Sequence, residues 1–496
     1  MKSFIKENKT KFDRIVDCVP AFLTITFLFL LIYISAVRPT WTAYFLTTYI
    51  IYYAYESIRV GVLSLNAYKK IKENRKIDWW NRLEKKYGKE LDGFYQAILI
   101  PFASEPLSVL EPTVKNLTKS NFPKKKIILV LATESAKPTG LEISRQLKKK
   151  YGNEFGHFLI TEHKLVEGEM KGKASNENYA GRELYKYVNE KGLNPKNIMV
   201  TSLDSDMKPD PQFLPMLTYK FFSEGKNRFK RIFQPLPINL EKAWGSITPA
   251  RLVASFGFQY FSAQMQMPRK LINYSVYSAS LHMIHAVGFW SPDIIPEDER
   301  FYWQSYFVYG TKLKVVPVFI PVYGDIIIGD SLWEAVKEQY KQIRRWAWGA
   351  TEIKYFLYHM ILDDSIPFAD KLVKLLIRIR THFEWVLIPV IISVGNFLPT
   401  WLNESYRKNP LAYMIPLFTS RILTVLLITF VLLIIMDNYY APPKPEGWKK
   451  HKTYLSYLAW VMFPIVSFFF SAFPAFEAQF RMLINKPIVY IETKKK

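Results

Sequence analysis

Long apolar tracts alternate with polar sequence along the chain. Five of them are near the length of a bilayer-spanning helix, and the last four are rich in Trp, Tyr and Phe: residues 19–37, 41–64, 383–400, 410–436 and 454–473. An apolar helix of about 20 residues crosses the hydrocarbon core, and aromatic residues gather where such helices meet the interface. The pattern therefore predicts an integral, multi-pass membrane protein that interacts with the lipid bilayer.

Between the second and third tracts, short apolar runs of strand length alternate with polar segments of helical character. The expected strands cover residues 97–101, 126–132, 157–161, 198–203, 232–235 and 313–317. Several are apolar on both faces, as buried parallel strands are. This alternation predicts an α/β domain with a largely parallel sheet over residues 65–367, in which ligands bind at the carboxyl ends of strands.

The segment 368–382 interleaves apolar residues with cations, which is typical of a basic amphipathic helix lying in the membrane interface. The alternative is a solvated charged helix packed on the sheet. With this segment, the chain divides into an N-terminal transmembrane hairpin (1–64), the α/β domain (65–367), the interfacial helix (368–382) and a C-terminal transmembrane region (383–496).

Lys and Arg number 67 against 43 Asp and Glu, a net charge of +24. The cations concentrate beside the apolar tracts, at 2–14, 69–86, 371–380 and 444–452, which is the cytoplasmic bias of membrane proteins. We therefore expect a cytoplasmic α/β domain and no nucleic-acid partner. The single cysteine, Cys18, excludes an intramolecular disulfide and a metal site built on several thiolates.

The fifth tract conflicts with this charge rule. A single crossing would place Lys494, Lys495 and Lys496 on the outer side. A re-entrant or interfacial segment, broken at Pro464 or Pro474, would remove the conflict.

Asp204 and Asp206 follow directly on the apolar run at 198–203. Two hard oxygen ligands at this spacing suit Mg²⁺ or Mn²⁺ held against a diphosphate, which neutralises the leaving group. The alternative is an ordinary Asp-rich turn after a strand.

Glu297 and Asp298 form a second carboxylate pair, at the start of an aromatic, helix-like segment. One of them would act as a general base on an acceptor hydroxyl, or both would simply cap the helix. Further on, Gln342, Arg345 and Trp346 offer an amide, a guanidinium and an indole that suit phosphate and a sugar ring. The alternative there is a surface helix with a buried Trp.

In this order, and flanked by apolar tracts, the three motifs resemble those of the membrane family 2 glycosyltransferases, to which cellulose and hyaluronan synthases belong. The resemblance runs from Ala97 to Trp346. It implies a GT-A (Rossmann-like) α/β fold flanked by transmembrane helices. It also implies a nucleotide-sugar donor of the UDP type, a divalent metal, and inversion at the anomeric carbon.

The resemblance also assigns roles by motif. Asp206 resembles the metal ligand, with Asp204 beside it facing the donor, and Asp298 resembles the base, with Glu297 beside it. Lys173, after Gly172, resembles the basic contact to the donor phosphates. The acceptor and diphosphate platform would consist of Gln342, Arg345 and Trp346.

The chain departs from the family pattern at three places. It has Pro101-Phe-Ala-Ser-Glu105 after the first strand, and Pro296 before the Glu-Asp pair. After the second strand, where an Asp usually contacts uracil, it has Glu134, which we expect to accept from the donor base.

Three functions follow as hypotheses. The first is a synthase that elongates a polysaccharide, and the second is a transferase that adds one sugar to a lipid acceptor. A transporter or anchored binding protein is the alternative of another class. It is favoured less, because the sequence contains no internal repeat and the large α/β domain would have no task.

Overall fold

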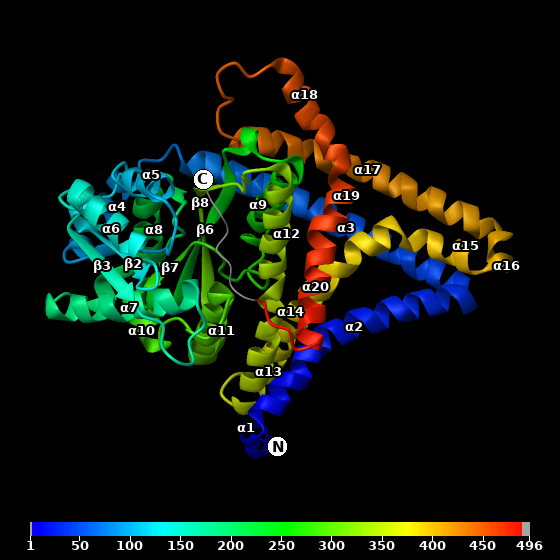
Figure 1. Cartoon of the computed structure of the whole chain (residues 1–496), viewed down its shortest axis with the longest axis horizontal. Helices are drawn as coiled ribbons and strands as arrows, with labels where there is room; N and C mark the ends of the chain where they lie inside the picture. The colour runs from blue at the N-terminus through cyan, green and yellow to red at the C-terminus, as the bar shows by residue number, and fades with distance from the viewer. Residues whose placement is uncertain (1, 489–496) are drawn as a thin grey trace. The chain divides into compact units, whose positions relative to one another are not determined.

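The computed structural model describes residues 2–488, and its strands form one eight-stranded sheet in the order β3-β2-β1-β4-β7-β6-β8-β5 (Figure 1). Their bounds are β1 Tyr95–Pro101, β2 Ile127–Glu134, β3 His157–His163, β4 Ile198–Ser202, β5 Lys208–Pro209, β6 Arg231–Glu241, β7 Tyr277–Ser280 and β8 Lys314–Asp325. All six expected strands are present.

The sheet is mixed, so the expectation of a largely parallel sheet was only partly right. Strands β1 to β4 pair in parallel, as do β6 and β8, whereas β7 is antiparallel to both β4 and β6, and β5 is antiparallel to β8. Strand β7 was not predicted because it has only four residues, Tyr277–Ser280, which are small and polar apart from one Tyr. It is nevertheless buried throughout.

Helices cover both faces of the sheet (Figure 1). Their bounds are α4 Trp79–Tyr87, α5 Leu107–Leu117, α6 Pro138–Tyr151, α7 Lys173–Glu190, α8 Phe213–Ser223, α10 Leu281–Ala286 and α11 Glu297–Tyr309. Alternate residues of β1, such as Ile98 and Ile100, belong to one core cluster with α4, α5, α6 and α8. Helix α7 packs on β1, β2 and β3.

Residues 66–243 and 264–328 form the unit that contains this sheet, hereafter the sheet unit. Residues 2–65, 244–263 and 329–488 form a second, helical unit. The expected domain 65–367 therefore differs from the sheet unit at two segments, because 244–263 and 329–367 belong to the helical unit. The residues that bear on the side of the C-terminus, Lys494 to Lys496, lie outside the described residues.

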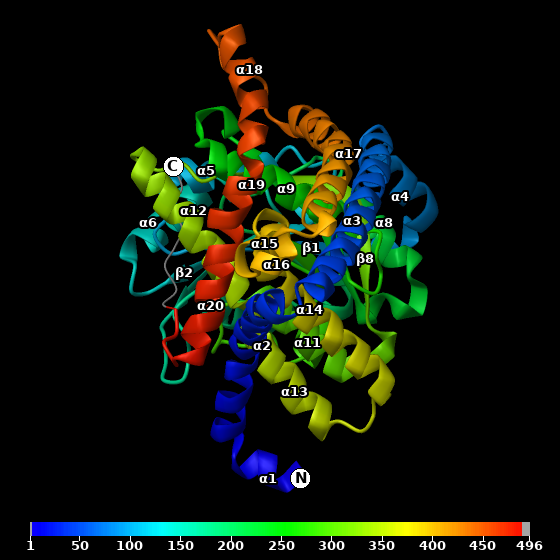
Figure 2. The same cartoon turned by 90° about the vertical axis from the view of Figure 1, so that its right-hand side faces the viewer.

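The helical unit contains the apolar tracts. Its helices are α1 Lys2–Glu7, α2 Lys9–Val37, α3 Pro39–Asn74 (up to residue 65), α9 Thr248–Gln264 (up to residue 263), α12 Leu332–Ala347, α13 Glu352–Leu362, α14 Phe368–Ser393, α15 Leu398–Leu402, α16 Glu404–Arg407, α17 Pro410–Tyr440, α18 Lys450–Leu458, α19 Phe463–Ser467 and α20 Phe473–Leu483. Helices α3 and α17 run side by side (Figure 2), and the Ser64 hydroxyl lies 3.6 Å from Met436 Sδ.

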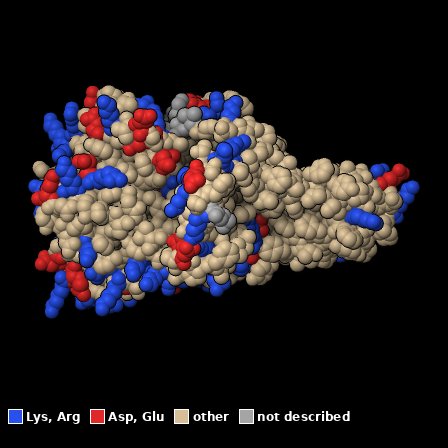
Figure 3. All heavy atoms as spheres, turned by 90° about the horizontal axis from the view of Figure 1, so that it is seen from below, with Lys and Arg blue, Asp and Glu red and all other residues tan. Residues whose placement is uncertain are grey.

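Among the described residues, three helices are long and apolar enough to cross a membrane: Lys9–Val37, Pro410–Tyr440 and Lys450–Leu483. A fourth span results if α14 and the segment Gly395–Leu402, which are bent by 50° at a short break, count as one. The expected second span, 41–64, lies within α3, which is not among the three. Figure 3 shows few charged side chains on the face in view around α2, except towards its far end.

Two expected boundaries inside the helical unit do not appear. The fifth tract lies within one unbroken helical run, Lys450–Leu483, so Pro464 and Pro474 do not break it. The run departs from α geometry just before each proline, with a 3₁₀ segment at Ala459–Met462 before Pro464 and a π segment at Phe468–Ala472 before Pro474. The segment 368–382 is the first part of α14, which continues to Ser393.

Candidate active site at the carboxyl end of strand β4

Asp204 and Asp206 stand in the turn that follows β4. This strand is buried along its whole length between β1 and β7, so neighbouring strands on both sides fix the position of its carboxyl end. The Met207 N–H donates to the Asp204 carbonyl at 3.0 Å, which closes the turn. Asp206 is 1% exposed, and its Oδ2 accepts from the backbone N–H of Asp325, at the end of β8, at 3.1 Å.

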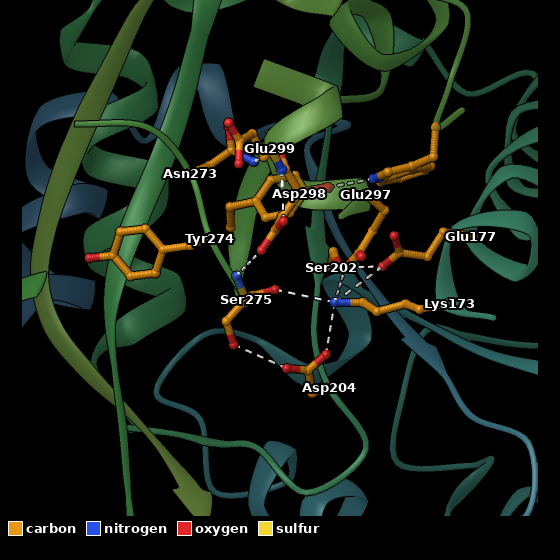
Figure 4. A network of polar contacts seen from close by, with 12 residues as sticks. Lys173, Glu177, Ser202, Asp204, Asn273, Tyr274, Ser275, Glu297, Asp298 and Glu299 are labelled. Carbon is orange, nitrogen blue, oxygen red and sulfur yellow. Dashed lines mark hydrogen bonds and ion pairs between the residues drawn. The ribbon is translucent and has the colours of Figure 1, made fainter. Parts of the chain in front are cut away.

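Lys173 is the first residue of α7 and reaches across to these carboxylates. It follows Gly172, whose φ of 149° lies in the region that favours glycine. The Lys173 ammonium lies 2.8 Å from Asp204 Oδ1 and 2.9 Å from Glu297 Oε1 (Figure 4). The ammonium therefore joins two motifs that are 93 residues apart in the sequence.

Glu297 and Asp298 open α11, and neither acts as its N-cap. The N-cap position is Pro296, which has no side chain able to accept a hydrogen bond. Glu297 turns to Lys173 instead. Asp298 accepts two backbone N–H groups, from Ser275 at 2.8 Å and from Glu299 at 2.7 Å. These contacts hold its carboxylate in place.

Ser275 connects the two aspartates. Its N–H donates to Asp298 Oδ2, and its hydroxyl donates to Asp204 Oδ2 at 3.0 Å. The structure thus brings together Lys173, Asp204, Glu297 and Asp298, all predicted from the sequence. Their roles stay predictions.

Glu177 is a site residue that the sequence analysis missed. It is 0% exposed, its Oε1 accepts from the Ser202 hydroxyl, and the same oxygen lies 3.8 Å from the Lys173 ammonium. The signal was its spacing, since residues four apart on a helix share a face.

Glu105 is a second missed residue, named in the sequence only as part of a departing motif. It accepts from the Ser205 hydroxyl at 3.0 Å and therefore contacts the turn between the two aspartates.

The cluster carries more negative than positive charge. The Lys173 ammonium lies close to three carboxylates, those of Glu177, Asp204 and Glu297. Ser275, which contacts the ammonium through its carbonyl, also binds the Asp298 carboxylate. Burial alone would lower the pKa of Lys173, but the surrounding carboxylates raise it well above its usual range. Burial raises the pKa of Glu177 to about 8 and also raises the pKa of Glu297, in both cases against the lowering effect of Lys173.

This charge balance bears on whether the expected divalent metal fits. Within residues 2–488, no group of three or more His, Cys, Asp or Glu side chains could hold a metal ion. Mg²⁺, however, is commonly bound by one or two carboxylates together with substrate phosphates. Asp204 and Asp206 offer those carboxylates, and the excess negative charge favours a cation. The residue types therefore suit a metal that shares its coordination with a bound diphosphate.

Glu134 and the platform residues lie elsewhere in the chain. Glu134 is the last residue of β2, at the same edge of the sheet as the end of β4. Gln342, Arg345 and Trp346 lie on α12 in the helical unit, where the Trp346 side chain is 38% exposed and not buried. The roles expected for all four residues stay predictions.

Comparison with known proteins gives weak results. No family model matches the sequence, and no curated protein matches it. Among solved structures, a mannosyltransferase from Pyrobaculum calidifontis in complex with GDP-Man and Mn²⁺ is similar at 11% identity, covering 82% of this chain and 97% of that chain, with a TM-score of 0.38. S. aureus TarS 1–349 in complex with UDP-GlcNAc is similar at 13% identity, covering 71% and 95%, with a TM-score of 0.36. Superpositions this loose carry no argument about this chain.

Proposed function

We propose that this chain is a membrane-embedded, inverting glycosyltransferase of family 2, which transfers a sugar from a UDP-sugar to a growing polysaccharide. One observation supports it most: Lys173, Asp204 and the Glu297-Asp298 pair come from three separate segments and meet where β4 ends. In α/β sheets, ligands bind at the carboxyl ends of strands.

Asp298 is the proposed general base. In the transfer, an acceptor hydroxyl attacks the anomeric carbon, the bond from that carbon to the nucleoside diphosphate breaks, and Asp298 takes the hydroxyl proton. Two backbone N–H groups already bind its carboxylate. They fix its orientation before the reaction, and a carboxylate oxygen has a further lone pair for the proton.

Lys173, Asp204 and Asp206 form the proposed donor side, with Glu134 as the proposed contact to the donor base. Lys173 would pair with the phosphates, and Asp204 and Asp206 would hold Mg²⁺ or Mn²⁺. When bound, such an ion neutralises the charge that develops on the departing diphosphate. Because three carboxylates already lie within 3.8 Å of the ammonium, Lys173 alone would not offset the charge of an incoming diphosphate.

The acceptor side rests on the motif alone. Gln342, Arg345 and Trp346 are the proposed platform for acceptor and diphosphate. A polysaccharide acceptor is the first proposal and a lipid acceptor the second, and the apolar helices suit either. The basic segments beside these helices support a cytoplasmic face for the sheet unit.

A donor screen tests this function. The full chain in detergent would be incubated with UDP-sugars and GDP-sugars, with Mn²⁺ or Mg²⁺, and nucleotide release and products would be measured. We expect UDP release from at least one UDP-sugar, and release about a hundredfold or more slower from the Asp298→Asn variant. A ladder of product lengths indicates polysaccharide synthesis, whereas one product indicates single addition. A wild-type protein that releases no nucleotide with any donor, as a transporter or binding protein would, contradicts the proposal.

A further inference from the structure

Every polar group of Ser275 contacts a different residue of the candidate site. Its N–H donates to Asp298 Oδ2 at 2.8 Å, and its hydroxyl donates to Asp204 Oδ2 at 3.0 Å. Its carbonyl accepts from the Lys173 ammonium at 3.3 Å (Figure 4). A single residue thus connects the proposed base to the proposed donor side.

These contacts depend on an unusual backbone conformation. Ser275 has a φ of 55°, in the left-handed region that residues other than glycine rarely adopt. In an ordinary conformation, the peptide groups on its two sides would point elsewhere, and the N–H and carbonyl contacts would not form together. Non-glycine residues stay in this region only where the surrounding structure holds them there.

Gln234, on β6, supplies that hold. Its side-chain amide donates to the carbonyls of Tyr274 at 3.2 Å and Val276 at 3.0 Å, and its Oε1 accepts from the Tyr274 N–H at 3.0 Å. The residues on both sides of Ser275 are therefore fixed by one side chain, which is 0% exposed. Asn273 also donates to the Asp298 carbonyl at 2.7 Å, which ties the same loop to the start of α11.

On this geometry, and resting on the proposed function, we propose that Ser275 is a positioning residue. It holds Asp204 and Asp298 in one fixed arrangement, through its hydroxyl on the donor side and its N–H on the base. Gln234 holds Ser275 in the conformation that makes both contacts. Neither residue touches substrate in this scheme; both act through the aspartates.

The hydroxyl contact is tested with Ser275→Ala, which keeps the backbone N–H and removes the donor to Asp204. A hydrogen bond to a charged group is involved, so we expect UDP–Mn²⁺ to bind about tenfold more weakly to the full chain in detergent. The kcat for UDP release should stay near the wild-type value, because Asp298 keeps its N–H partner. Ser275→Gly should bind UDP–Mn²⁺ as weakly as Ser275→Ala, but with equal or greater thermal stability, since glycine accepts the positive φ.

Ser278→Ala is the matched control for the hydroxyl. Ser278 is also buried, and its hydroxyl shares a hydrogen bond of 2.8 Å with the Thr201 hydroxyl inside the sheet, away from the site carboxylates. It should keep the wild-type affinity for UDP–Mn²⁺. If Ser275→Ala and Ser278→Ala bind UDP–Mn²⁺ equally well, the hydroxyl has no positioning role.

The backbone contact is tested with Gln234→Leu, which removes the hold on both sides of Ser275. We expect kcat to fall about tenfold or more, since a lost hydrogen bond to the Asp298 carboxylate is of that order, together with the loss of affinity seen in Ser275→Ala. The matched control is Gln96→Leu, because Gln96 is likewise 0% exposed in a strand and donates to the Thr218 hydroxyl at 2.7 Å. All rates would be compared well below each melting temperature.

The outcomes separate this inference from the function on which it rests. If the wild-type protein neither binds UDP–Mn²⁺ nor releases nucleotide from any donor, the proposed function is wrong and the positioning role falls with it. If the wild-type protein is active and Gln234→Leu has the same kcat as Gln96→Leu, only the positioning role is wrong. A fall in kcat that is confined to Gln234→Leu, with affinity lowered by both Gln234→Leu and Ser275→Ala, supports it.

Discussion

Each unit of the molecule contains a buried cluster of charged side chains, and the two clusters differ in how their charges balance. In the helical unit, Arg251 on α9 pairs with Asp437 on α17, and the Ser255 hydroxyl also donates to Asp437. The ring of Trp244 lies 4.3 Å from the Arg251 guanidinium. In the sheet unit, one ammonium is surrounded by several carboxylates.

The difference separates a structural pair from a candidate site. One cation, one anion and a hydroxyl leave the Arg251–Asp437 cluster close to neutral, and Asp437 is 0% exposed. The opposite charges of that cluster offset each other. The Lys173 cluster has surplus negative charge, so a proton or a cation stabilises it, and perturbed ionisable groups of this kind gather at functional sites. The surplus therefore favours a role beyond holding the fold together.

The largest expected effect is on the surplus cluster, through Asp298→Asn. An amide cannot accept the hydroxyl proton but keeps the shape of the carboxylate, so donor binding should persist while transfer is lost. General base catalysis typically contributes about a hundredfold to ten-thousandfold, and we expect a fall in kcat of that order. Single-turnover transfer and equilibrium binding of UDP–Mn²⁺ would separate the two effects. Transfer at the wild-type rate would show that Asp298 is not the base.

A substitution in the Arg251–Asp437 cluster should lower the stability of the protein instead. Asp437→Ala leaves the Arg251 guanidinium buried beside an indole without its anion, and breaking a buried pair in this way costs about 3–5 kcal/mol. We expect a clearly lower melting temperature in detergent. The double variant Arg251→Met with Asp437→Leu should regain most of it.

Asp204→Asn is the contrasting variant, since it removes one of the surplus carboxylates. It should not lower the melting temperature. If Asp437→Ala and Asp204→Asn shift the melting temperature equally, the distinction between the two clusters is wrong.

The sheet unit followed from local pattern more closely than the helical unit did. Apolar runs such as 198–203 predict buried strands, because their residues must be covered on both faces. Strand β7 could not be predicted, since Tyr277–Ser280 is buried by its neighbours β4 and β6 and not by its own apolar character. Helix α9 lies between β6 and β7 in the sequence yet belongs to the helical unit. Local pattern could not predict this, because Arg251 of α9 pairs with Asp437, which is 186 residues away.

The candidate site shows the same limit. Asp204 and Asp298 were predictable because carboxylates follow a strand or open a helix in an ordered set of motifs. Ser275 and Gln234 belong to no motif, and their importance comes from a positive φ and from contacts across the sheet. Glu177 lay between these cases, since its helical spacing from Lys173 was visible but its burial was not.

A further comparison within the sheet unit uses two buried aspartates. Asp206→Asn should remove most of the metal-dependent donor binding, because an amide is a poor ligand for a hard cation. Loss of a residue that only hydrogen-bonds a metal ligand typically lowers metal affinity about tenfold or more. Loss of a direct ligand should therefore weaken UDP binding in the presence of Mn²⁺ by at least the same factor. Asp210→Asn is the control, since Asp210 pairs with Arg75 at 2.9 Å and has no role in the site. An unchanged Mn²⁺ dependence in Asp206→Asn would remove Asp206 from the metal assignment.

The smallest expected effect is on the pH dependence of stability, through the protonation of Glu177. Burial raises the pKa of Glu177 to about 8 from an ordinary value of 4.5. Between these values the folded protein binds a proton that the unfolded chain does not. The stabilising contribution of this group is therefore complete below pH 4.5 and is lost as the pH rises to about 8. The slope is at most about 1.4 kcal/mol per pH unit.

Glu177→Gln cannot titrate, so its free energy of unfolding should fall less than that of the wild-type protein between pH 5.5 and pH 8, by the linkage just described. Thermal unfolding in detergent at several pH values would measure this. The exposed Glu167→Gln variant should keep the wild-type slope. Because Gln keeps an acceptor for the Ser202 hydroxyl, a changed slope would report the charge and not the shape. Equal slopes in Glu177→Gln and the wild-type protein would mean that Glu177 is ionised in the folded state, and that Lys173 offsets more of the surplus charge than the geometry indicates.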